Sequence, residues 1–546
     1  MKGKTNQILS LLVAIIVINI IASHYYFRFD LTEDKRYTLS NTTTEIVENV
    51  EEILQINVYL KGNFPAEFKR LQTETLLHLE ELKAKNSNIH FKFINPSKIG
   101  QKLIDKGLTP SNLQVLENGN YTELTLFPWA VIEYKNKRET VPLLTETNTA
   151  SQEEQLQKSI QNLEFAFANA LHKVTSKKSK KIAVLKGNGQ LDDIYLADFL
   201  TSLGEYYLLA PFTLDSVANN PKKTLNQLTD YDLAIIAKPT EKFSEKEKFT
   251  LDQFVMNGGK SIWLIDNVQA ELDSLMQTGE TLAYPRDLGV TDMFFNYGFR
   301  LTNNLVTDLY SSQITLATGK VGNRTQFNAF PWKYYPLVQN TNSHPITNNI
   351  GPVNFKFAVA IDTLKNNIQK HILLQSSKLS KAVGTPSIVS LKSISNKENQ
   401  NSFTKGNFPL ALLLEGEFKS AYAGRVKPFS IENSKDKSVT NQLIVIGDGD
   451  LIANDVAQGK PLPLGYDKWT NEQYGNKNFL INCVNYLLDD KDLVSLRNKT
   501  VKIQFLNKQK AFDEALKWRI VNILVPLLIL GVFGLLFNYF RKKKYQ

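Results

Sequence analysis

Three aspartates in the stretch "GDGDLIAND" have the types and spacing that a metal site or a pair of catalytic acids would use. Asp448, Asp450 and Asp455 lie at or after the end of "QLIVIG", an apolar run typical of a buried strand. In parallel α/β sheets, ligands bind at the carboxyl ends of the strands. Asp and Gly are also ordinary turn formers at this place, and neither His nor Glu lies nearby in the sequence to complete a coordination shell. A structural turn is the preferred interpretation, and the three aspartates are the candidates for a metal.

The stretch "MNGGKSIWLID", residues 256–266, contains fragments of a nucleotide-binding site. A phosphate-binding loop reads G-x-x-x-x-G-K-[ST] and leads from a strand into a helix. Here Phe254 stands where the first glycine is needed. The order of elements is also reversed, because Ser244 and Glu247 form a capping box that begins a helix, and Gly258 ends it before the strand. The C-terminus of a helix repels phosphate, so we expect no ATP binding and no cofactor in this chain.

The single cysteine and one Gly-x-Gly loop are further candidates for chemistry. One cysteine excludes an intrachain disulfide and a cysteine metal cluster. Cys483 lies among apolar residues in the middle of an expected helix, as a small buried hydrophobic residue would. Asn188 belongs to "KGNGQ", and a lone loop of this kind is weak evidence for phosphate binding. No catalytic residue is predicted, and Asn188 is kept as a candidate for a ligand or partner surface.

Aromatic residues crowd the stretch "FNAFPWKYYP", residues 327–336. Its two prolines predict an irregular segment. Aromatic faces stack on sugar rings or anchor partner proteins, which makes Phe330, Trp332, Tyr334 and Tyr335 candidates for a ligand or partner surface. A loop folded onto its own core accounts for the same residues equally well.

Two apolar segments predict two transmembrane helices. Residues 8–27 hold no charged side chain, and residues 520–540 are followed at once by the basic run 541–544. A cleaved signal peptide is the competing interpretation of the first segment, but "NIIASH" lacks the small residues of a cleavage site. Two spans place both termini on one side of the membrane, and the basic tail makes that side cytoplasmic. We therefore expect a bacterial inner-membrane protein with a large periplasmic body.

The second span carries residues that a simple membrane anchor does not need. These are Asn522, Pro526, Gly531 and Gly534. Small residues let another helix approach closely, and an amide inside hydrocarbon seeks a partner. The two glycines are three residues apart and do not form the G-x-x-x-G dimer motif. We expect this span to contact a multispanning membrane partner rather than a second copy of itself.

The composition is that of a globular protein with several domains. The chain has 546 residues, of which 42% are apolar and 22% charged, so it has room for about three or four domains of ordinary size. The net charge of +10 is spread along the chain. Without a basic helix or an aromatic nucleic-acid motif, nucleic acid is not an expected partner.

The pattern of apolar segments predicts an α/β body. Residues 40–175 read as strands and helices in the order βαβαββα, which is the order of thioredoxin-like domains, although no C-x-x-C motif is present. After the polar junction "TSKKSKK", apolar strands such as "KIAVL", "YDLAIIAKP" and "SIWLID" alternate with helices. This alternation predicts a parallel sheet that is covered by helices on both faces.

Several stretches together resemble the GldG family of gliding-motility-associated ABC transporters. They are "YYFRFDLTEDKRYTLS", "IAVLKGNGQ", "KPTEKFSEKEKFTLDQFVMNGGKSIWLID", "IVIGDGDLIAND" and "GNKNFLINCVNYLLDD", with a span at each end. The long central stretch is specific, whereas "GDGDLIAND" is shared with many ABC-transporter auxiliary proteins. The resemblance implies a class I glutamine amidotransferase-like second domain, similar to a domain of an intraflagellar transport protein. Carbohydrate binding is a suggested role of that group.

The expected fold class is α/β with two transmembrane helices, a thioredoxin-like N-terminal periplasmic domain and a doubly wound amidotransferase-like domain. The predicted domains are a cytoplasmic tail with a transmembrane anchor (1–27), a thioredoxin-like domain without C-x-x-C (28–175), an amidotransferase-like domain with irregular insertions (176–495), a linker (496–518), a transmembrane helix (519–540) and a basic cytoplasmic tail (541–546).

The resemblance implies a non-catalytic auxiliary, substrate-binding-like subunit that works beside a multispanning permease and a separate cytoplasmic ATPase. Three other functions stay open. The chain could bind cell-surface polysaccharide, or it could be a purely structural strut. It could also hydrolyse such a polysaccharide with Asp448 and Asp450, which would need the two acids about 5 to 10 Å apart beside an open groove.

Overall fold

The computed structural model describes most of residues 35–498 and 508–545. Within these ranges it does not describe 63, 118–119, 146–151, 177, 323, 340–343, 349, 396–398 and 489–492, and before residue 35 it describes only 13–17, 19, 30 and 32. The chain divides into two compact units, residues 1–500 and 501–546. Most of the predicted N-terminal span, residues 8–27, therefore lies outside the described residues.

The first sheet has four strands in the order β2-β1-β5-β6. Its strands are β1 (Leu54–Val58), β2 (Ile89–Phe93), β5 (Trp129–Tyr134) and β6 (Lys137–Pro142). β1 runs parallel to β2 and antiparallel to β5. The helices of this region are α2 (Asn41–Glu48), α3 (Ala66–Lys85), α4 (Gly100–Ile104) and α5 (Gln152–Thr175). The expected order of elements is present, with an additional hairpin of β3 (Ser111–Glu117) and β4 (Asn120–Leu126) that was not expected.

The second sheet, called the large sheet below, has seven strands in the order β18-β21-β22-β10-β9-β7-β8. Five of them run parallel, namely β7 (Lys181–Lys186), β8 (Leu208–Thr213), β9 (Leu233–Ala237), β10 (Lys260–Leu264) and β22 (Lys437–Ile446). The prediction of a parallel sheet is wrong at one edge, where β21 (Pro409–Lys419) runs antiparallel to both β22 and β18 (Gln369–Gln375). Antiparallel neighbours need no crossover helix, and residues 420–436 between β21 and β22 contain none.

Both faces of the large sheet are buried, as a sheet between two helical layers requires. Along β9, Ala234 and Ile236 enter the core on one face, whereas Leu233 and Ile235 enter the core on the other. Helix α8 (Glu245–Met256) packs on the first face, and α6 (Asp193–Gly204) and α11 (Asn476–Leu488) pack on the second. Cys483 of α11 is fully buried in the second core, which confirms its expected place in an apolar site.

The helix that precedes β10 begins and ends as predicted. The Ser244 hydroxyl accepts a hydrogen bond from the Glu247 amide, and the Glu247 carboxylate accepts one from the Ser244 amide. Gly258 follows the helix with a φ of +100°, a conformation that glycine adopts without strain. The Lys260 ammonium at the start of β10 donates to the Leu487 carbonyl near the end of α11. The Lys260 ammonium thus binds the C-terminal end of a helix, where a cation is favourable, and is not part of a phosphate-binding loop.

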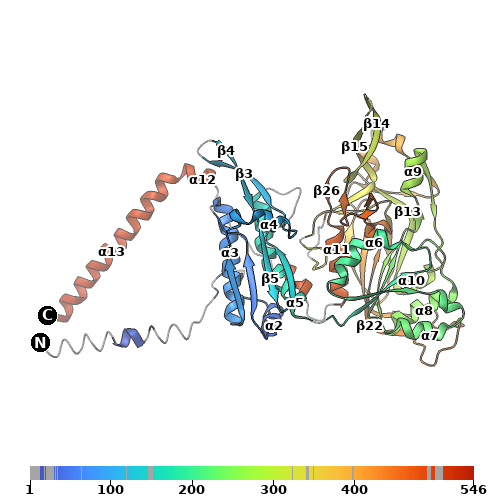
Figure 1. The fold of residues 1–546 in the computed structure, drawn as a ribbon, viewed down its shortest axis with the longest axis horizontal. Helices are drawn as coiled ribbons and strands as arrows, with labels where there is room; N and C mark the ends of the chain where they lie inside the picture. The colour runs from blue at the N-terminus through green and yellow to red at the C-terminus, as the bar shows by residue number, and fades with distance from the viewer. Residues whose placement is uncertain are drawn as a thin grey trace. The chain divides into compact units, whose positions relative to one another are not determined.

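The aromatic segment 327–336 is not irregular, as its prolines predict, but lies within a strand. It belongs to β15 (Arg324–Val338), which pairs with β14 (Ser311–Val321) in a long antiparallel hairpin (Figure 1). The ladder steps from the pair Ser311–Pro336 directly to Gln313–Pro331, so a bulge separates the two prolines. Proline lacks an amide donor and is tolerated at such bulges, which explains how a strand accommodates both.

The second unit contains α12 (Lys508–Asp513) and α13 (Ala515–Tyr545). Residues Ala515–Lys543 are long and apolar enough to cross a membrane, with a mean hydropathy of 2.7 in their most apolar stretch. Among the described residues this is the one helix of that kind. It begins within the segment predicted as a linker, residues 496–518, and continues through the basic residues 541–544 to Tyr545. The C-terminal helix is therefore longer than the predicted span.

Candidate ligand site at the carboxyl edge of the large sheet

Charged residues that follow three neighbouring strands of the large sheet meet at one edge. Lys238 follows β9, Asp266 follows β10, and Asp448 and Asp450 follow β22. Because the carboxyl ends of parallel strands lie at the same edge, residues far apart in the sequence are brought together here. The Lys238 ammonium lies 2.6 Å from an Asp450 carboxylate oxygen and 3.4 Å from one of Asp266. We call these four residues the Lys238 network.

The Asp448 carboxylate holds the loop that follows β22. It is fully buried, and its two oxygens accept hydrogen bonds from the Asp450 amide at 2.8 Å and the Lys356 amide at 2.6 Å. The amide of Gly449, between the two aspartates, donates to Asp266. A Cβ atom at Gly449 would lie 2.6 Å from the Cγ atom of Lys238, so only glycine fits against the stem of the lysine side chain. The "GDGD" motif is thus required for this turn.

The electrostatics of the network follow from its burial. Burial disfavours the charged form of Lys238, but the surrounding carboxylates of Asp450, Asp266 and Glu271 outweigh this effect and raise its pKa. Burial and the nearby Asp450 carboxylate raise the pKa of Asp266 to about 6. Burial also raises the pKa of Asp448, with Asp266 and Asp450 adding to the effect. The lysine is therefore held as an ammonium by carboxylates that are costly to ionise without it.

The network has the donor set of a metal site but contains its own cation. Oxygens of Asp266, Asp448 and Asp450 lie within 4.8 Å of one another, close enough to share an ion. The Lys238 ammonium contacts two of these three carboxylates. Lys238 also has a left-handed backbone, with a φ of +51°, which costs a residue other than glycine free energy. The lysine side chain thus supplies at this place the positive charge that a metal would bring.

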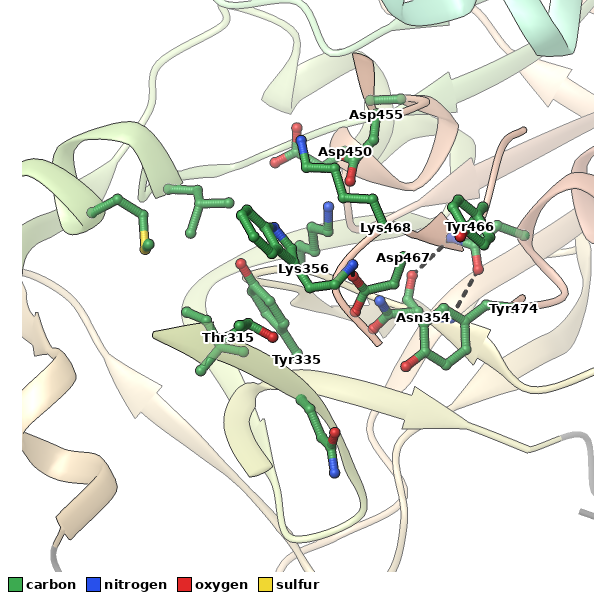
Figure 2. Close-up of a pocket in the computed structure, with 18 of the residues that line it drawn as sticks. Thr315, Tyr335, Asn354, Lys356, Asp450, Asp455, Tyr466, Asp467, Lys468 and Tyr474 are labelled. Carbon is green, nitrogen blue, oxygen red and sulfur yellow. Dashed lines mark hydrogen bonds between the residues drawn. The ribbon is translucent and has the colours of Figure 1, made fainter. Parts of the chain in front are cut away.

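A cavity of about 210 Å³ opens beside the network (Figure 2). Asp450 belongs to both, because it lines the cavity and binds Lys238. The other walls come from α9 (Leu272–Thr278), from β14 and β15, and from the segments 354–356, 453–455 and 465–476. Many of the side chains that line it are aromatic or charged; they are Tyr335, Tyr466, Trp469, Tyr474, Asp273, Asp450, Asp455, Asp467, Lys356 and Lys468.

Two hydroxyl groups in the cavity wall have no hydrogen-bond partner among the described residues. Tyr335 is only 4% exposed, and its hydroxyl is buried without a partner, as is that of Thr315. In Figure 2 these two side chains lie on one side of the cavity, and Asp450 and Asp455 lie on the opposite side. Burial, and then the carboxylates of Asp450 and Asp455, raise the pKa of Tyr335. Buried polar groups are normally satisfied, so an unpartnered hydroxyl in a cavity wall is available to bind a ligand atom.

The structure brings together only some of the residues that the sequence singled out. Asp450, Asp455 and Tyr335 share the cavity wall, whereas Asp448 lies behind it. Trp332 and Tyr334 are buried in the hydrophobic core, in agreement with the interpretation of a segment folded onto its own core. Phe330 is half-buried and lies outside the cavity lining.

Asn188 lies in a structural turn away from the cavity. Its carbonyl accepts hydrogen bonds from the amides of Thr240 and Glu241. A Cβ atom at the neighbouring Gly189 would lie 2.0 Å from the Thr240 hydroxyl. The Gly-x-Gly pattern is therefore explained by the close packing of this turn against the loop after β9.

Two members of the Lys238 network, Lys238 and Asp266, and much of the cavity wall were not predicted from the sequence. Lys238 and Asp266 each follow an apolar strand within two residues, "DLAIIAK" and "SIWLID". Their position directly after an apolar strand could have indicated them, because the carboxyl ends of parallel strands lie at the same edge of a sheet. Trp469 and Tyr466 come from a loop without a periodic pattern, and nothing in the local sequence indicates that they line a cavity.

The comparisons with known proteins identify a family. Residues 179–483 match the model of a family of ABC-transporter auxiliary proteins, described as an "ABC-type uncharacterized transport system". This match covers more than half of the chain, and the chain belongs to that family. Residues 33–133 match a second model, a domain of unknown function. The protein is therefore a transport-associated accessory protein with a candidate membrane helix at its C-terminal end.

One relative matches over the entire length. An uncharacterized protein of Borreliella burgdorferi is 23% identical over 568 residues, and the match covers 100% of both chains. Among solved structures, the chain is similar to the "mmIFT52 N-terminal domain", with 13% identity and a TM-score of 0.32 over 57% of this chain and 98% of that one. A likeness at this level supports no conclusion about fold or function.

Proposed function

We propose that this protein is a membrane-anchored accessory subunit of an ABC transporter and that its body lies on the extracytoplasmic side. The observation that carries the proposal is the family match over residues 179–483, in a chain that ends in the apolar helix α13. The basic residues 541–544 near the end of this helix favour a cytoplasmic C-terminus. In a bacterium, the anchor would lie in the inner membrane and the body in the periplasm.

The partner that fits α13 is a multispanning permease. Asn522 and Pro526 interrupt the apolar stretch of this helix, and Gly531 and Gly534 follow further along it. Glycines let another helix approach closely, and the amide can find a hydrogen-bond partner within the bilayer.

The energy source of the proposed complex is a separate ATPase on the cytoplasmic side. In this chain the "GGKS" stretch ends a helix, and Lys260 is engaged by the Leu487 carbonyl. Neither feature suits a phosphate, which is stabilised by the N-terminus of a helix. We propose that the periplasmic body responds to ATP turnover without binding nucleotide.

We also propose that the chain is a member of the GldG family and has the two domain folds which that resemblance and the order of elements imply. Resemblance to GldG supports an association with gliding motility. The parallel β1–α3–β2 unit beside the antiparallel strands β5 and β6 supports a thioredoxin-like fold for residues 28–175. Five parallel strands with helices on both faces support an amidotransferase-like fold for residues 176–495.

The hydrolase alternative receives no support from the carboxylates. Asp448 is fully buried, and both of its oxygens accept backbone amides. Asp450 is paired with Lys238. These two acids therefore do not face each other across an open groove, as glycoside hydrolysis requires.

Co-purification in mild detergent tests the accessory-subunit proposal. The native chain is compared with a variant in which residues 520–540 are replaced by poly-leucine, which keeps a membrane span but removes the amide, proline and glycines. We expect the permease to co-purify with the native chain and to be lost from the variant. A native chain that never retains a permease contradicts the complex. Equal recovery with both chains places the contact outside α13.

A further inference from the structure

The cavity beside the Lys238 network is lined by charges of both signs that do not neutralise one another. Asp455, Asp467 and Lys356 are half-buried and Lys468 is exposed. Within the part of the chain that the structure describes, none of the four forms an ion pair, whereas neighbouring Asp450 is paired with Lys238 at 2.6 Å. Asp467 accepts hydrogen bonds from the Trp469 amide and the Thr470 hydroxyl, and Lys468 donates to the Val456 carbonyl. Ammonium and carboxylate groups that form no ion pair around one small space suit a ligand that itself carries both charges.

The balance of these charges restricts the ligand further. Asp450 is already paired with Lys238. The other charged groups in the lining are three carboxylates and two ammonium groups, those of Asp273, Asp455, Asp467, Lys356 and Lys468. A purely anionic ligand would be repelled by this excess. A ligand with more positive than negative groups matches it.

The two unpartnered hydroxyls are independent evidence that the cavity receives a polar group. The Tyr335 hydroxyl is buried and lies in a wall that faces Asp450 and Asp455 (Figure 2). An ammonium or guanidinium group placed there could donate to the hydroxyl oxygens of Tyr335 and Thr315 and lie close to carboxylates. The same group would be attracted to the aromatic faces of Tyr466 and Trp469.

The size of the cavity points to a small molecule. Its volume of about 210 Å³ is below the range of roughly 300–1,000 Å³ that is typical of pockets for drug-sized ligands. Trp469 is 54% exposed at its margin, so the cavity is open to solvent and a ligand can enter. We propose that this cavity binds a small zwitterion with net positive charge, of the size of a basic amino acid.

The proposed binding mode assigns a role to each wall. The ammonium or guanidinium end of the ligand is bound by Asp455 and the Tyr335 hydroxyl, its apolar stem packs on Trp469, and its carboxylate is bound by Lys356. The site is formed by this chain alone, so it does not depend on the transporter complex proposed above.

Calorimetric titration of the purified full-length chain in mild detergent tests the proposal. The probes are L-lysine and L-arginine, compared with L-glutamate and glucose. We expect saturable binding of lysine or arginine and much weaker binding of glutamate and glucose. The absence of saturable binding of lysine and arginine at millimolar concentration would overturn the proposal, and so would glutamate or glucose binding as tightly as they do.

Two variants place the ligand in this cavity. Tyr335→Phe removes one hydroxyl and Asp455→Asn removes one charge, and each should weaken binding roughly three- to tenfold or more. Tyr310→Phe and Asp436→Asn are matched controls at exposed positions outside the cavity and should bind as the wild type does. Because the Tyr335 hydroxyl has no partner in the chain, Tyr335→Phe should melt at the wild-type temperature. Unchanged affinity in both cavity variants contradicts the proposed site.

Discussion

The Lys238 network and the adjoining cavity lie at the same edge of the large sheet, but their charged side chains are paired in the first and not in the second. In the Lys238 network, buried carboxylates surround a buried ammonium, and backbone amides fill the remaining positions on Asp448. In the adjoining cavity, Lys356 and Asp455 line a small space and form no ion pair among the described residues. Removing charge from water is costly unless a partner is supplied. We therefore infer that the paired charges of the network stabilise the fold, whereas the charges in the cavity wall are available to bind a ligand.

The largest effect should follow from removing the network's cation. Lys238→Met leaves the carboxylates of Asp266, Asp448 and Asp450 crowded together without a counter-charge. We expect the free energy of unfolding to fall by about 3–5 kcal/mol, as it does when one partner of a buried ion pair is removed. The measurement is denaturant unfolding of the full chain in detergent.

Lys242→Met is the matched control for this prediction. Lys242 is close in the sequence, but it is exposed and paired with exposed Asp287. Surface pairs contribute about 0–1 kcal/mol. If the two lysine variants lost the same free energy of unfolding, the buried ion pairs of Lys238 would contribute no more to stability than a surface pair. The Lys238 network would then not stabilise the fold.

The second effect concerns the pH dependence of stability. Burial and then Asp450 raise the pKa of Asp266 from 3.8 to about 6. Because the folded pKa lies above the unfolded one, this residue contributes stability that is fully present below the unfolded pKa of 3.8 and is lost as pH rises through about 6.

The test compares the wild type with Asp266→Asn at several pH values. The free energy of unfolding of the wild type minus that of the variant should fall by up to about 3 kcal/mol between about pH 4 and about pH 7, since one pKa unit corresponds to about 1.4 kcal/mol. A difference that stays constant or rises with pH would show that Asp266 is an ordinary, ionised carboxylate.

A third change lies in the core on the far side of the large sheet from α8. Cys483 is fully buried, and burial raises the pKa of its thiol. Cys483→Ser places a hydroxyl in this apolar site and should cost about 1–3 kcal/mol, measured by unfolding. Recovery of the permease should be unchanged. A variant that is folded but no longer functional would point to a reactive thiol instead.

The smallest effect is expected at the "GGKS" stretch. Lys260→Ala removes a cation from the C-terminal end of α11 and should lower the free energy of unfolding by about 0.3–1 kcal/mol. ATP binding by equilibrium dialysis should be absent with either chain. Micromolar ATP binding that disappears in the variant would contradict the proposal that a separate ATPase, and not this chain, binds the nucleotide.

Local patterns predicted the elements well, because their signals are contained in a few consecutive residues. The capping box of Ser244 and Glu247 and the stop at Gly258 appear where the sequence places them. Apolar runs likewise predicted the buried parallel strands. The antiparallel partner β21 was not predicted, because an apolar run has no direction of pairing.

The site was predicted only in part, because its members come from distant segments. The sequence indicated Asp448 and Asp450, but the ammonium between them comes from Lys238 on another strand. Tyr335 was grouped with Trp332 and Tyr334 by its neighbours. All three side chains are buried in one core, but only Tyr335 also lines the cavity. Such differences within one segment depend on tertiary packing and are not visible in composition or spacing.

The most direct test of the contrast between the two regions is the reactivity of their lysines. Limited acetylation of the native chain, followed by mass spectrometry, compares Lys238 with Lys356 and Lys468 in one sample. An ammonium that is buried and held by carboxylates reacts slowly, because its neutral form is rare and inaccessible. The account predicts that Lys356 and Lys468 are acetylated well before Lys238. Acetylation of Lys238 at the same rate as Lys356, in a chain that is still folded, would contradict it.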